Sequence, residues 1–408
     1  MKKTGLVEEW GGKTALFFSY THLSHDITTG LLGALIPFIR QDLGLDYLKA
    51  GFLVSAYALA SGFAQFLGGW LSDRLGPRKA ISLGLAGVGV SGAAIIFASS
   101  YSILVTVFII MGILSGFYHP SAVSALTNRF EDKKRGHVIA LHMLGGGLGF
   151  AIGPFLGAII SSSLNWRFAF LFLSLPAIVA AVLAFSQLKL TPTTAQLKEM
   201  ASSPEIKQNP VGIWQVFKAA AGIMALSILM ALITGPVMSF LPLFLVDIHH
   251  LSDSAGSTWV TIIRLGGLLG SLFGGWLADK WGKRNAIFLA LVLFGPVVFL
   301  LAKLPFGFLL GVVFILFGGL MSMRETTMQA YLMDNTPPKI RATVFGIYFG
   351  FGQQGSSIAQ PIAGNYMDMV GITSVYSIIA YISMGLSLLS LVIALEFGKW
   401  IKKFRHNS

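Results

Sequence analysis

The sequence predicts an all-α membrane protein with twelve transmembrane helices arranged as two pseudo-symmetric six-helix halves. Three observations support this prediction: a composition that is 54% hydrophobic and 11% charged, apolar stretches that recur along the chain, and a motif repeated at a fixed offset. An ordinary soluble domain is about one quarter charged. Each apolar stretch, as a helix rising about 1.5 Å per residue, is long enough to cross a hydrocarbon core about 30 Å thick.

Turn residues and charges divide the chain into its apolar spans. We expect these spans near residues 15–39, 47–71, 79–98, 102–127, 137–160, 166–187, 220–246, 256–277, 285–301, 306–332, 342–366 and 374–395. The first run follows a polar start and lacks a small-residue cleavage site, so we interpret it as a span and not as a signal peptide. The polar segment 189–211 is the predicted cytoplasmic linker between an N-terminal half, 1–188, and a C-terminal half, 212–408.

Lysine and arginine set the expected orientation, because they concentrate in short cytoplasmic loops. Most of the 29 lysines and arginines fall on one face if the N-terminus is cytoplasmic; the other face receives only Arg40, Lys49, Arg167 and Lys303. We therefore expect an integral plasma (inner) membrane protein with both termini in the cytoplasm. The net charge of +12 is spread over membrane-facing loops, which argues against nucleic-acid binding. The absence of cysteine excludes disulfides and thiolate metal sites.

An internal repeat relates the two halves. The segment Gly68–Gly76 returns as Gly274–Gly282, so that Asp73 and Asp279 occupy the same place 206 residues apart. Each copy falls where the second span of a half meets its cytoplasmic turn. Parallel six-span repeats are typical of transporters that bind their solute at the interface between the repeats.

The repeated segment resembles the signature of the major facilitator superfamily, G-x-x-x-D-(R/K)-x-G-x-(R/K)-(R/K), and the resemblance covers essentially the whole chain. The first copy supplies Gly69, Asp73, Arg74, Gly76, Arg78 and Lys79. The second supplies Gly275, Asp279, Lys280, Gly282, Lys283 and Arg284. The resemblance implies a conformational latch, in which the acid and the cations pair in one state and separate in another. A plain charged turn is the alternative, and two copies at a fixed offset argue against it.

The fifth span carries a glycine motif made of Gly149, Gly153, Pro154 and Gly157. Small residues at every fourth position give a helix a flat face for close contact, and proline adds a point where the helix bends. The motif resembles one found in drug/proton antiporters of the same superfamily. Generic glycine packing in a membrane helix is the alternative interpretation.

Ionisable residues inside spans are costly and are therefore candidates for function. They occur in the first, fourth, eighth and tenth spans, as His22, His25, Asp26, His119, Arg264, Arg324 and Glu325. His22 and Asp26 are four residues apart and so share one helix face. The offset of 206 residues makes His119 equivalent to Glu325. The resemblance implies that the first, fourth, seventh and tenth spans line the central path.

Buried carboxylates beside histidines take up and release protons when solvent access changes sides. We therefore expect Asp26, with His22 or His25, to be the proton-coupling site. Glu325 is a second candidate, unless the adjacent Arg324 neutralises it and the two form a structural pair.

Arginine presents a planar fork of donors that suits an anionic group, so Arg264 is predicted to bind the substrate. A helix carbonyl or a gate carboxylate is the alternative partner for Arg264. His119, Arg324 and Gln353 complete the predicted substrate-binding set, with simple cavity lining as the alternative for Gln353.

Within the superfamily the chain is most similar to the fosmidomycin-resistance type of drug/proton efflux protein. The matching residues are His22 with Asp26, the stretch Phe117–Pro120 and the glycine-rich fifth span. Gly112 stands where other drug/proton antiporters carry an arginine, so coupling has to rest on other groups. The resemblance implies alternating access and proton-coupled efflux, or antiport, of amphiphilic or anionic compounds. The alternative is an uptake or exchange carrier for a small organic anion, such as a carboxylate or a phosphorylated metabolite.

Motifs for enzymatic chemistry are missing from the sequence. It contains no H-E-x-x-H, no G-x-S-x-G and no phosphate loop, so nothing supplies a metal centre, a nucleophile or a nucleotide cradle. We expect no enzyme activity, no catalytic residue, no cofactor and no metal. The expected partners are a small-molecule substrate, protons and the lipid bilayer, and the chain is expected to be a monomer because it contains both halves.

Overall fold

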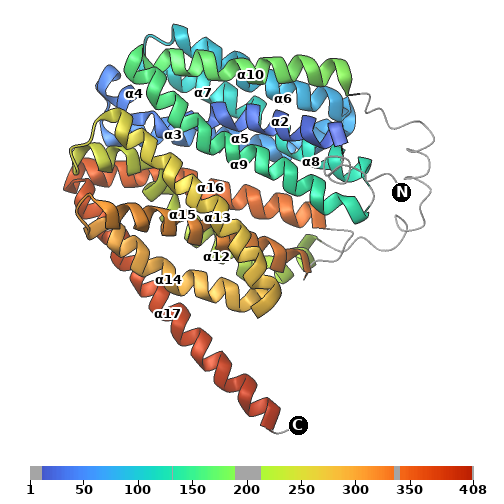
Figure 1. Ribbon diagram of the computed structural model, residues 1–408, viewed down its shortest axis with the longest axis vertical. Coiled ribbons are helices and arrows are strands. Elements are labelled where there is room, and N and C mark those ends of the chain that lie inside the picture. The colour runs from blue at the N-terminus through green and yellow to red at the C-terminus, as the bar shows by residue number, and fades with distance from the viewer. Residues whose placement is uncertain (1–11, 131, 189–212, 335–340, 407–408) are drawn as a thin grey trace.

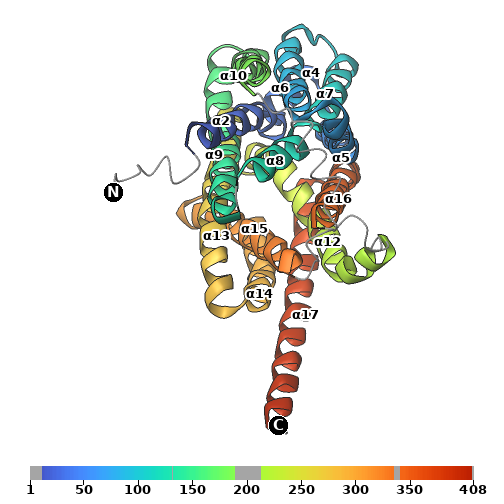
Figure 2. The same cartoon turned by 90° about the vertical axis from the view of Figure 1, so that its right-hand side faces the viewer.

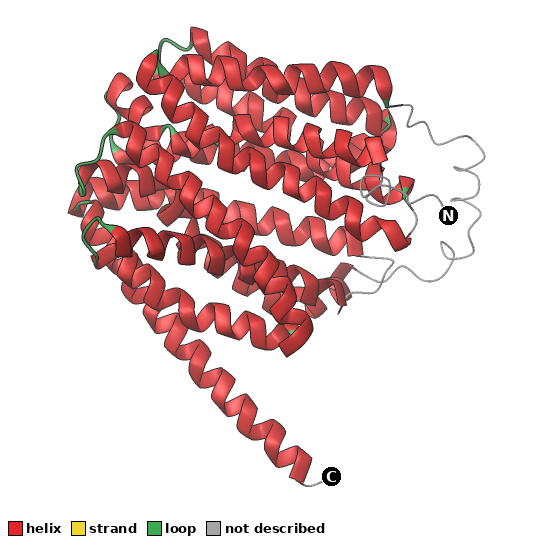
Figure 3. Cartoon of the chain, viewed as in Figure 1, coloured by secondary structure: helices red, strands yellow, loops and turns green. Residues whose placement is uncertain are grey.

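The computed structural model describes residues 12–130, 132–188, 213–334 and 341–406. Over these residues the chain forms helices joined by short turns, without any strand (Figure 3). The predicted all-α fold class is confirmed. The predicted linker 189–211 lies outside the described residues, and the division into two halves at this segment stays a prediction.

The N-terminal helices precede the linker. Their bounds are α2 Gly12–Thr29, α3 Leu31–Ala34, α4 Ile36–Leu43, α5 Tyr47–Leu75, α6 Pro77–Ala94, η1 Ile95–Phe97, α7 Tyr101–Ser115, α8 Tyr118–Arg129, α9 Asp132–Ser163 and α10 Trp166–Gln187. The C-terminal helices follow it. Their bounds are α12 Ile213–Asp247, α13 Asp253–Trp281, α14 Lys283–Lys303, α15 Phe308–Asp334, α16 Arg341–Val370 and α17 Ile372–His406.

Nine helices within the described residues are long and apolar enough to cross a membrane. The first predicted span is covered by α2, α3 and α4, which follow one another with short irregular joints. Helical hydrogen bonds continue through the joints, because Gly30 N donates to Asp26 O at 2.8 Å and Leu35 N to Leu31 O at 2.9 Å. The total of twelve spans stays a prediction.

Two groups of helices lie side by side in the bundle. Helices α2 to α10 form one group and α12 to α17 the other, as Figures 1 and 2 show from directions 90° apart. The two groups meet mainly where α5 packs against α16 and where α9 packs against α13. The last helix, α17, extends beyond the rest of the bundle at its C-terminal end (Figure 1).

The sequence repeat has a counterpart in the packing. A Cβ built at Gly68 would lie 3.3 Å from the Cα of Phe117, and one built at Gly274 would lie 2.9 Å from the Cα of Met323. The two glycines are separated by the repeat offset, and so are their partners. Equivalent residues therefore make equivalent helix contacts in the two groups, with glycine allowing the backbones to approach.

One end of the bundle is closed by polar contacts between the two groups. Arg40 Nη1 forms an ion pair with Asp247 Oδ2 at 2.5 Å, and the Tyr47 hydroxyl donates to the same carboxylate. Asp368 accepts the backbone N–H groups of Tyr47 and Leu48 at 2.9 and 2.8 Å. The carboxylate of α16 thereby caps the first turn of α5, where free N–H groups favour an anion.

Further contacts between the groups lie deeper along the same two seams. They are Ser55 Oγ to Ser357 O at 2.5 Å, Gln354 Nε2 to Leu59 O at 3.4 Å and Thr261 Oγ1 to Ala151 O at 2.9 Å. Five of these six residues lie nearer to the closed end of their helix than to the opposite end, and Gln354 lies near the middle of α16. The closed end also carries the loops with few cations, so the predicted orientation makes it the extracytoplasmic end.

Candidate proton and substrate site

Three ionisable side chains of α2 are buried within the N-terminal group of helices. His22 is 4% exposed, His25 1% and Asp26 2%. The four-residue spacing places His22 and Asp26 on one helix face, as expected from the sequence. Groups of this kind are not buried in an apolar bundle unless they are paired, so their partners define the site.

Asp26 is held between two imidazole rings. Its Oδ2 lies 3.1 Å from His22 Nε2, and its Oδ1 lies 2.6 Å from His25 Nδ1. His119, from α8, places its Nε2 4.0 Å from Asp26 Oδ1. The side chain of His119 is 34% exposed, so the cluster has a buried centre and a more open edge.

The outer nitrogens of these rings are bonded to other helices. His22 Nδ1 lies 2.9 Å from the carbonyl oxygen of His142 on α9. His25 Nε2 lies 2.8 Å from Ser115 Oγ at the end of α7, and Ser115 is in turn 2.8 Å from the Tyr57 hydroxyl of α5. With His119 on α8, the cluster is therefore assembled from five helices of the N-terminal group, α2, α5, α7, α8 and α9.

Ring contacts fix the orientation of the histidines. His25 stacks on Tyr118 with ring centroids 4.7 Å apart, and His22 stacks on His142 at 4.2 Å. His119 meets the edges of both His22 and His25, at 5.1 and 4.7 Å. The planes of these rings, and so the directions of their nitrogens, are set by packing.

Glycines of α9 bring this helix directly against the cluster. A Cβ built at Gly146 would lie 2.5 Å from His22 Nε2 and 2.7 Å from Asp26 Oδ2. Because only glycine leaves this space open, the backbone of α9 covers the contact between the two side chains.

The glycine motif continues this close approach along α2. Cβ atoms built at Gly149, Gly153 and Gly157 would lie 2.7 Å from Leu23 O, 2.5 Å from Ile27 O and 2.5 Å from Leu31 Cδ2. Pro154 lies inside α9. Gly149 and Gly153 therefore face α2, which carries the buried carboxylate, and Gly157 faces Leu31 of the short helix α3 that follows it.

Arg264, on α13, links the two groups of helices. Its guanidinium lies 4.9 Å from the ring centroid of Phe150 on α9, and it is within electrostatic range of both Glu325 and Asp26. In the part of the chain that the structure describes, its buried Nε has no hydrogen-bond partner and its guanidinium no ion pair. Arg264 thus carries an unused Nε–H donor where α13 packs against α9.

Arg324 and Glu325 point into different surroundings on α15. Arg324 is 4% exposed, and its NH1 lies 3.9 Å from Met328 Sδ. Glu325 is exposed and, among the described residues, has no ion pair with Arg324 or any other cation. The side chain of Gln353 lies outside the described side chains, so its predicted role stays a prediction.

The first copy of the predicted latch is described only in part. The side chain of Asp73 and the surroundings of Gly69 lie outside the description. Arg74 is exposed, and the guanidinium of Arg78 lies 4.5 Å from the ring centroid of Phe185. Gly76 has φ +79°, a left-handed conformation that favours glycine.

The second copy ends in the same kind of turn, because Gly282 has φ +91°. Asp279 and Lys280 are exposed, and Asp279 has no ion pair with any described residue. A Cβ built at Gly275 would meet nothing within 4 Å, whereas Gly274 packs against α15. The glycine in close contact is therefore the one beside the signature glycine, and the latch itself stays a prediction.

Metal-like spacing occurs at the cluster. Ligand atoms of His22, Asp26 and His119 all lie within 4.8 Å of one another. Two of these three ligands are already in contact with each other at 3.1 Å. This spacing fits a hydrogen bond between His22 and Asp26.

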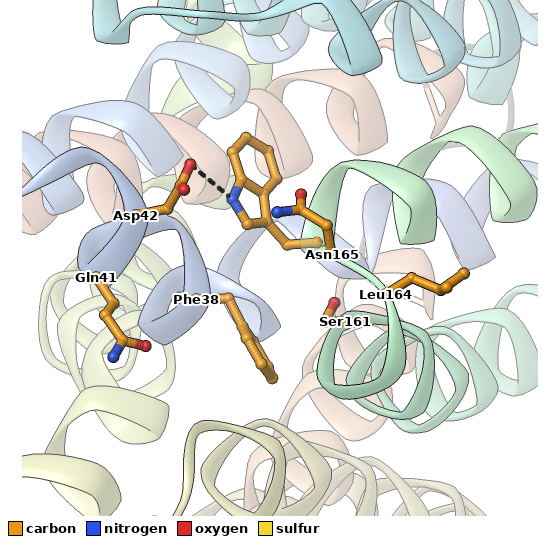
Figure 4. Close-up of a pocket in the computed structure, with 7 residues that line it drawn as sticks. Phe38, Gln41, Asp42, Ser161, Leu164 and Asn165 are labelled. Carbon is orange, nitrogen blue, oxygen red and sulfur yellow. Dashed lines mark hydrogen bonds between the residues drawn. The ribbon is translucent and has the colours of Figure 1, made fainter.

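A small pocket lies at the closed end, away from the cluster (Figure 4). It has a volume of about 290 Å³ and is lined by Phe38, Gln41, Asp42, Ser161, Leu164, Asn165 and Trp166. The Asp42 carboxylate accepts from Trp166 Nε1 at 3.2 Å and from Arg167 NH1 at 2.6 Å. The Asp42 carboxylate of the pocket therefore joins α4 to α10.

A bundle of long apolar helices, built from two groups and with ionisable side chains buried inside it, is typical of a membrane transporter. The chain belongs to the Major Facilitator Superfamily, whose family model matches residues 18–361 and 223–405. The predicted family is confirmed. Its members are membrane transporters, and the expectation that the protein is not an enzyme is confirmed with it.

Relatives of known description cover most of the chain. The protein is 21% identical over 375 residues to the fosmidomycin resistance protein of Escherichia coli strain K12, covering 90% of this chain and 89% of the relative. It is 23% identical over 367 residues to a gallate transporter of Pseudomonas putida, covering 83% and 82%. The fold is similar to the crystal structure of a D-xylose-proton symporter, with a TM-score of 0.77, 16% identity and coverage of 92% and 96%.

Sequence reasoning found His22, His25, Asp26 and His119, and the structure brings these four together. It did not assign roles to Ser115, Tyr57 or Tyr118, which complete the cluster. Tyr118 lies within the stretch Phe117–Pro120 that carries the family resemblance. For Ser115 and Tyr57 the sequence signal is a polar atom on a residue within an apolar stretch, and such residues are common in membrane helices.

Proposed function

We propose that the protein is a secondary active transporter that exports amphiphilic or anionic small molecules in exchange for protons. The observation that supports this most is the burial of Asp26 between two histidines in a membrane helix. An ionisable group at such a place is costly and is typical of a proton or ion path. Imidazole groups beside it exchange protons near neutral pH.

The open edge of the cluster gives the proton a route. His119 is partly exposed, and its Nε2 lies 4.0 Å from the buried carboxylate. A proton taken up by His119 therefore reaches Asp26 after a small movement of either side chain. Gly146 brings the backbone of α9 over the opposite side, which limits entry from that direction.

Alternating access is the mechanism that fits a bundle closed at one end. The polar contacts between the two groups lie toward that end, including the pair formed by Arg40 and Asp247. Opening this end requires these contacts to break, and closure of the other end would follow from rocking one group against the other. We place the protein in the plasma (inner) membrane, with both termini in the cytoplasm.

Arg264 is the proposed anchor for an acidic group of the substrate. Its fork of donors is not filled by any described residue, and it lies within range of both Asp26 and Glu325. Glu325, exposed on α15, is the second candidate for proton coupling, and His119 and Arg324 belong to the proposed substrate-binding set.

Flux into proteoliposomes tests the proposal, with fosmidomycin and gallate as the compounds. A proton gradient should drive uphill movement of at least one compound in the wild type. The substitution Asp26→Asn should abolish this driving while one-for-one exchange continues. Asp253→Asn is the control, because it removes the same charge at the start of α13. Proton coupling would be refuted if the flux were the same with and without the proton gradient and the same in the wild type and in Asp26→Asn.

A second candidate is a carrier that takes up or exchanges small organic anions without protons. Two arginines in membrane helices favour it, because Arg264 and Arg324 each have a buried Nε without a partner among the described residues. The gallate transporter among the relatives is consistent with an anionic substrate. This candidate predicts that Arg264→Lys stops gallate flux, since lysine lacks the planar fork, and that Asp26→Asn does not.

A further inference from the structure

Hydrogen-bond directions at Asp26 locate its exchangeable proton. A backbone carbonyl only accepts, so His22 Nδ1 donates to His142 O at 2.9 Å. The remaining nitrogen, Nε2, faces Asp26 Oδ2 at 3.1 Å. With His22 neutral and Asp26 ionised, two lone pairs would face each other. One proton therefore belongs at this contact, on either the imidazole or the carboxyl.

The His25 side of the carboxylate behaves differently. The Tyr57 hydroxyl donates to Ser115 Oγ, Ser115 donates to His25 Nε2, and His25 Nδ1–H donates to Asp26 Oδ1, over distances of 2.8, 2.8 and 2.6 Å. In this order every link has one donor and one acceptor while His25 stays neutral. These three hydrogen bonds need no exchangeable proton, but their strength depends on the charge of Asp26.

Tyr57, the last residue of these hydrogen bonds, lies close to the seam between the two groups of helices. Tyr57 lies on α5 between Ser55 and Leu59, and both of these residues bond to α16. Ser55 Oγ donates to Ser357 O at 2.5 Å, and Leu59 O accepts from Gln354 Nε2 at 3.4 Å. These hydrogen bonds therefore end on the part of α5 that is fastened to the opposite group.

We propose that His25, Ser115 and Tyr57 form a positioning relay that transmits the protonation of Asp26 to the seam between α5 and α16. The inference rests on the proposed proton coupling and adds the route by which it moves the helices. The closed structure holds one proton at the contact between His22 and Asp26. When this pair gains a second proton, Asp26 becomes a neutral carboxyl and a weaker acceptor for His25. The relay then loosens, α5 loses a restraint beside its bonds to α16, and opening of the closed end is favoured.

Other ionisable groups face the same carboxylate and are part of its environment. Those on neighbouring elements are His119 and Tyr118 of α8, His142 of α9, Tyr57 of α5 and Arg264 of α13. None of the first three bonds to a residue that crosses to α16. The relay through Ser115 is the described route from Asp26 to that seam.

Pulsed electron paramagnetic resonance on a labelled chain tests the relay. The sequence has no cysteine, so Lys49→Cys and Ser374→Cys, both exposed at the closed end, give a unique pair of spin-label sites. The distance distribution is recorded from about pH 5 to pH 9, where histidine clusters titrate. The variants are Tyr57→Phe and Ser115→Ala. Tyr20→Phe is the control, because its hydroxyl donates to Pro176 O at 3.3 Å in the same group, outside the relay.

The wild type should open at this end as the pH falls, with a measurable midpoint. Both relay variants weaken the donor that stabilises ionised Asp26, so proton binding becomes easier and the midpoint should rise by about one pH unit, a tenfold change. The change in distance between high and low pH should also be smaller, because the variants lack the restraint on α5 at every pH and are already partly open above the midpoint. Tyr20→Phe should keep the wild-type midpoint and amplitude.

Two different failures are distinguishable. If both relay variants keep the wild-type midpoint and amplitude, the relay is wrong and the proton site stands. If the wild type itself shows no dependence on pH, the proposed proton coupling fails together with the relay. Ser115→Ala, a small change, keeps the test decisive if Tyr57→Phe disturbs folding.

Discussion

Close packing of α9 on α2 predicts the effect of one added methyl group. In Gly153→Ala the new Cβ would lie 2.5 Å from the Ile27 carbonyl oxygen and 3.2 Å from its carbonyl carbon. A carbon and a carbonyl oxygen normally stay about 3.3 Å or more apart. The partner atoms belong to backbone, so no side chain can rotate away, and the two helices have to separate by several tenths of an ångström.

The expected cost is about 1–3 kcal/mol, the range for overfilling a packed interior. Gly275→Ala is the matched control, because it is also a glycine within a long helix and its Cβ would meet nothing within 4 Å. There the better helix propensity of alanine should leave stability unchanged or raise it by up to about 1 kcal/mol.

Thermal unfolding in one detergent, followed by loss of monodisperse protein, compares the two variants with the wild type. Gly153→Ala should melt several degrees lower than Gly275→Ala. It should also reduce proton-driven flux, because the same movement withdraws α9 from Asp26. Equal melting temperatures for the two variants would show that α9 and α2 are not held together by this glycine face.

Two further predictions concern the closed end. Asp247→Asn removes the ion pair with Arg40, and the two side chains are each 26% exposed. The loss of about 1.5 kcal/mol should raise the population that is open at this end about tenfold. The spin-label pair at residues 49 and 374 measures this population, and an unchanged distance distribution would contradict the prediction. His249 is half-buried against Phe244, and burial together with His250 lowers its pKa below the usual 6.5. Protons therefore bind the unfolded form better than the folded form, and the stability of the folded form falls as the pH drops below about 6.5. The melting temperature should be lower at pH 5 than at pH 8, and the difference should be smaller in His249→Phe.

The sequence alone predicted the fold class, the family and the ionisable residues inside the membrane. These are local or repetitive properties. The length of an apolar stretch can be compared directly with the thickness of a bilayer. A charged residue within the stretch can be identified from the sequence without knowing its partner. The motif around Asp73 and its copy around Asp279 identified the family because the pattern itself repeats.

The same motif shows the limit of pattern reading. The signature singles out Gly275, which has open space around it, whereas the neighbouring Gly274 is the one packed on α15. A pattern gives the position of a glycine along the chain. Which of two adjacent glycines faces a neighbouring helix depends on the rotation of the helix about its axis, and that is set by all its contacts together.

Only the tertiary structure decided what surrounds Asp26. Its relay partner Ser115 is 90 residues from His25, and the carbonyl that orients His22 is 120 residues away on α9. Closure of one end likewise depends on Asp247 meeting Arg40 across 207 residues. Such contacts depend on how far each helix is shifted along its axis and how it is rotated about that axis. The periodicity of a single helix does not specify either of these. The sequence determined which ionisable groups lie within the apolar helices, and packing determined which of them are in contact.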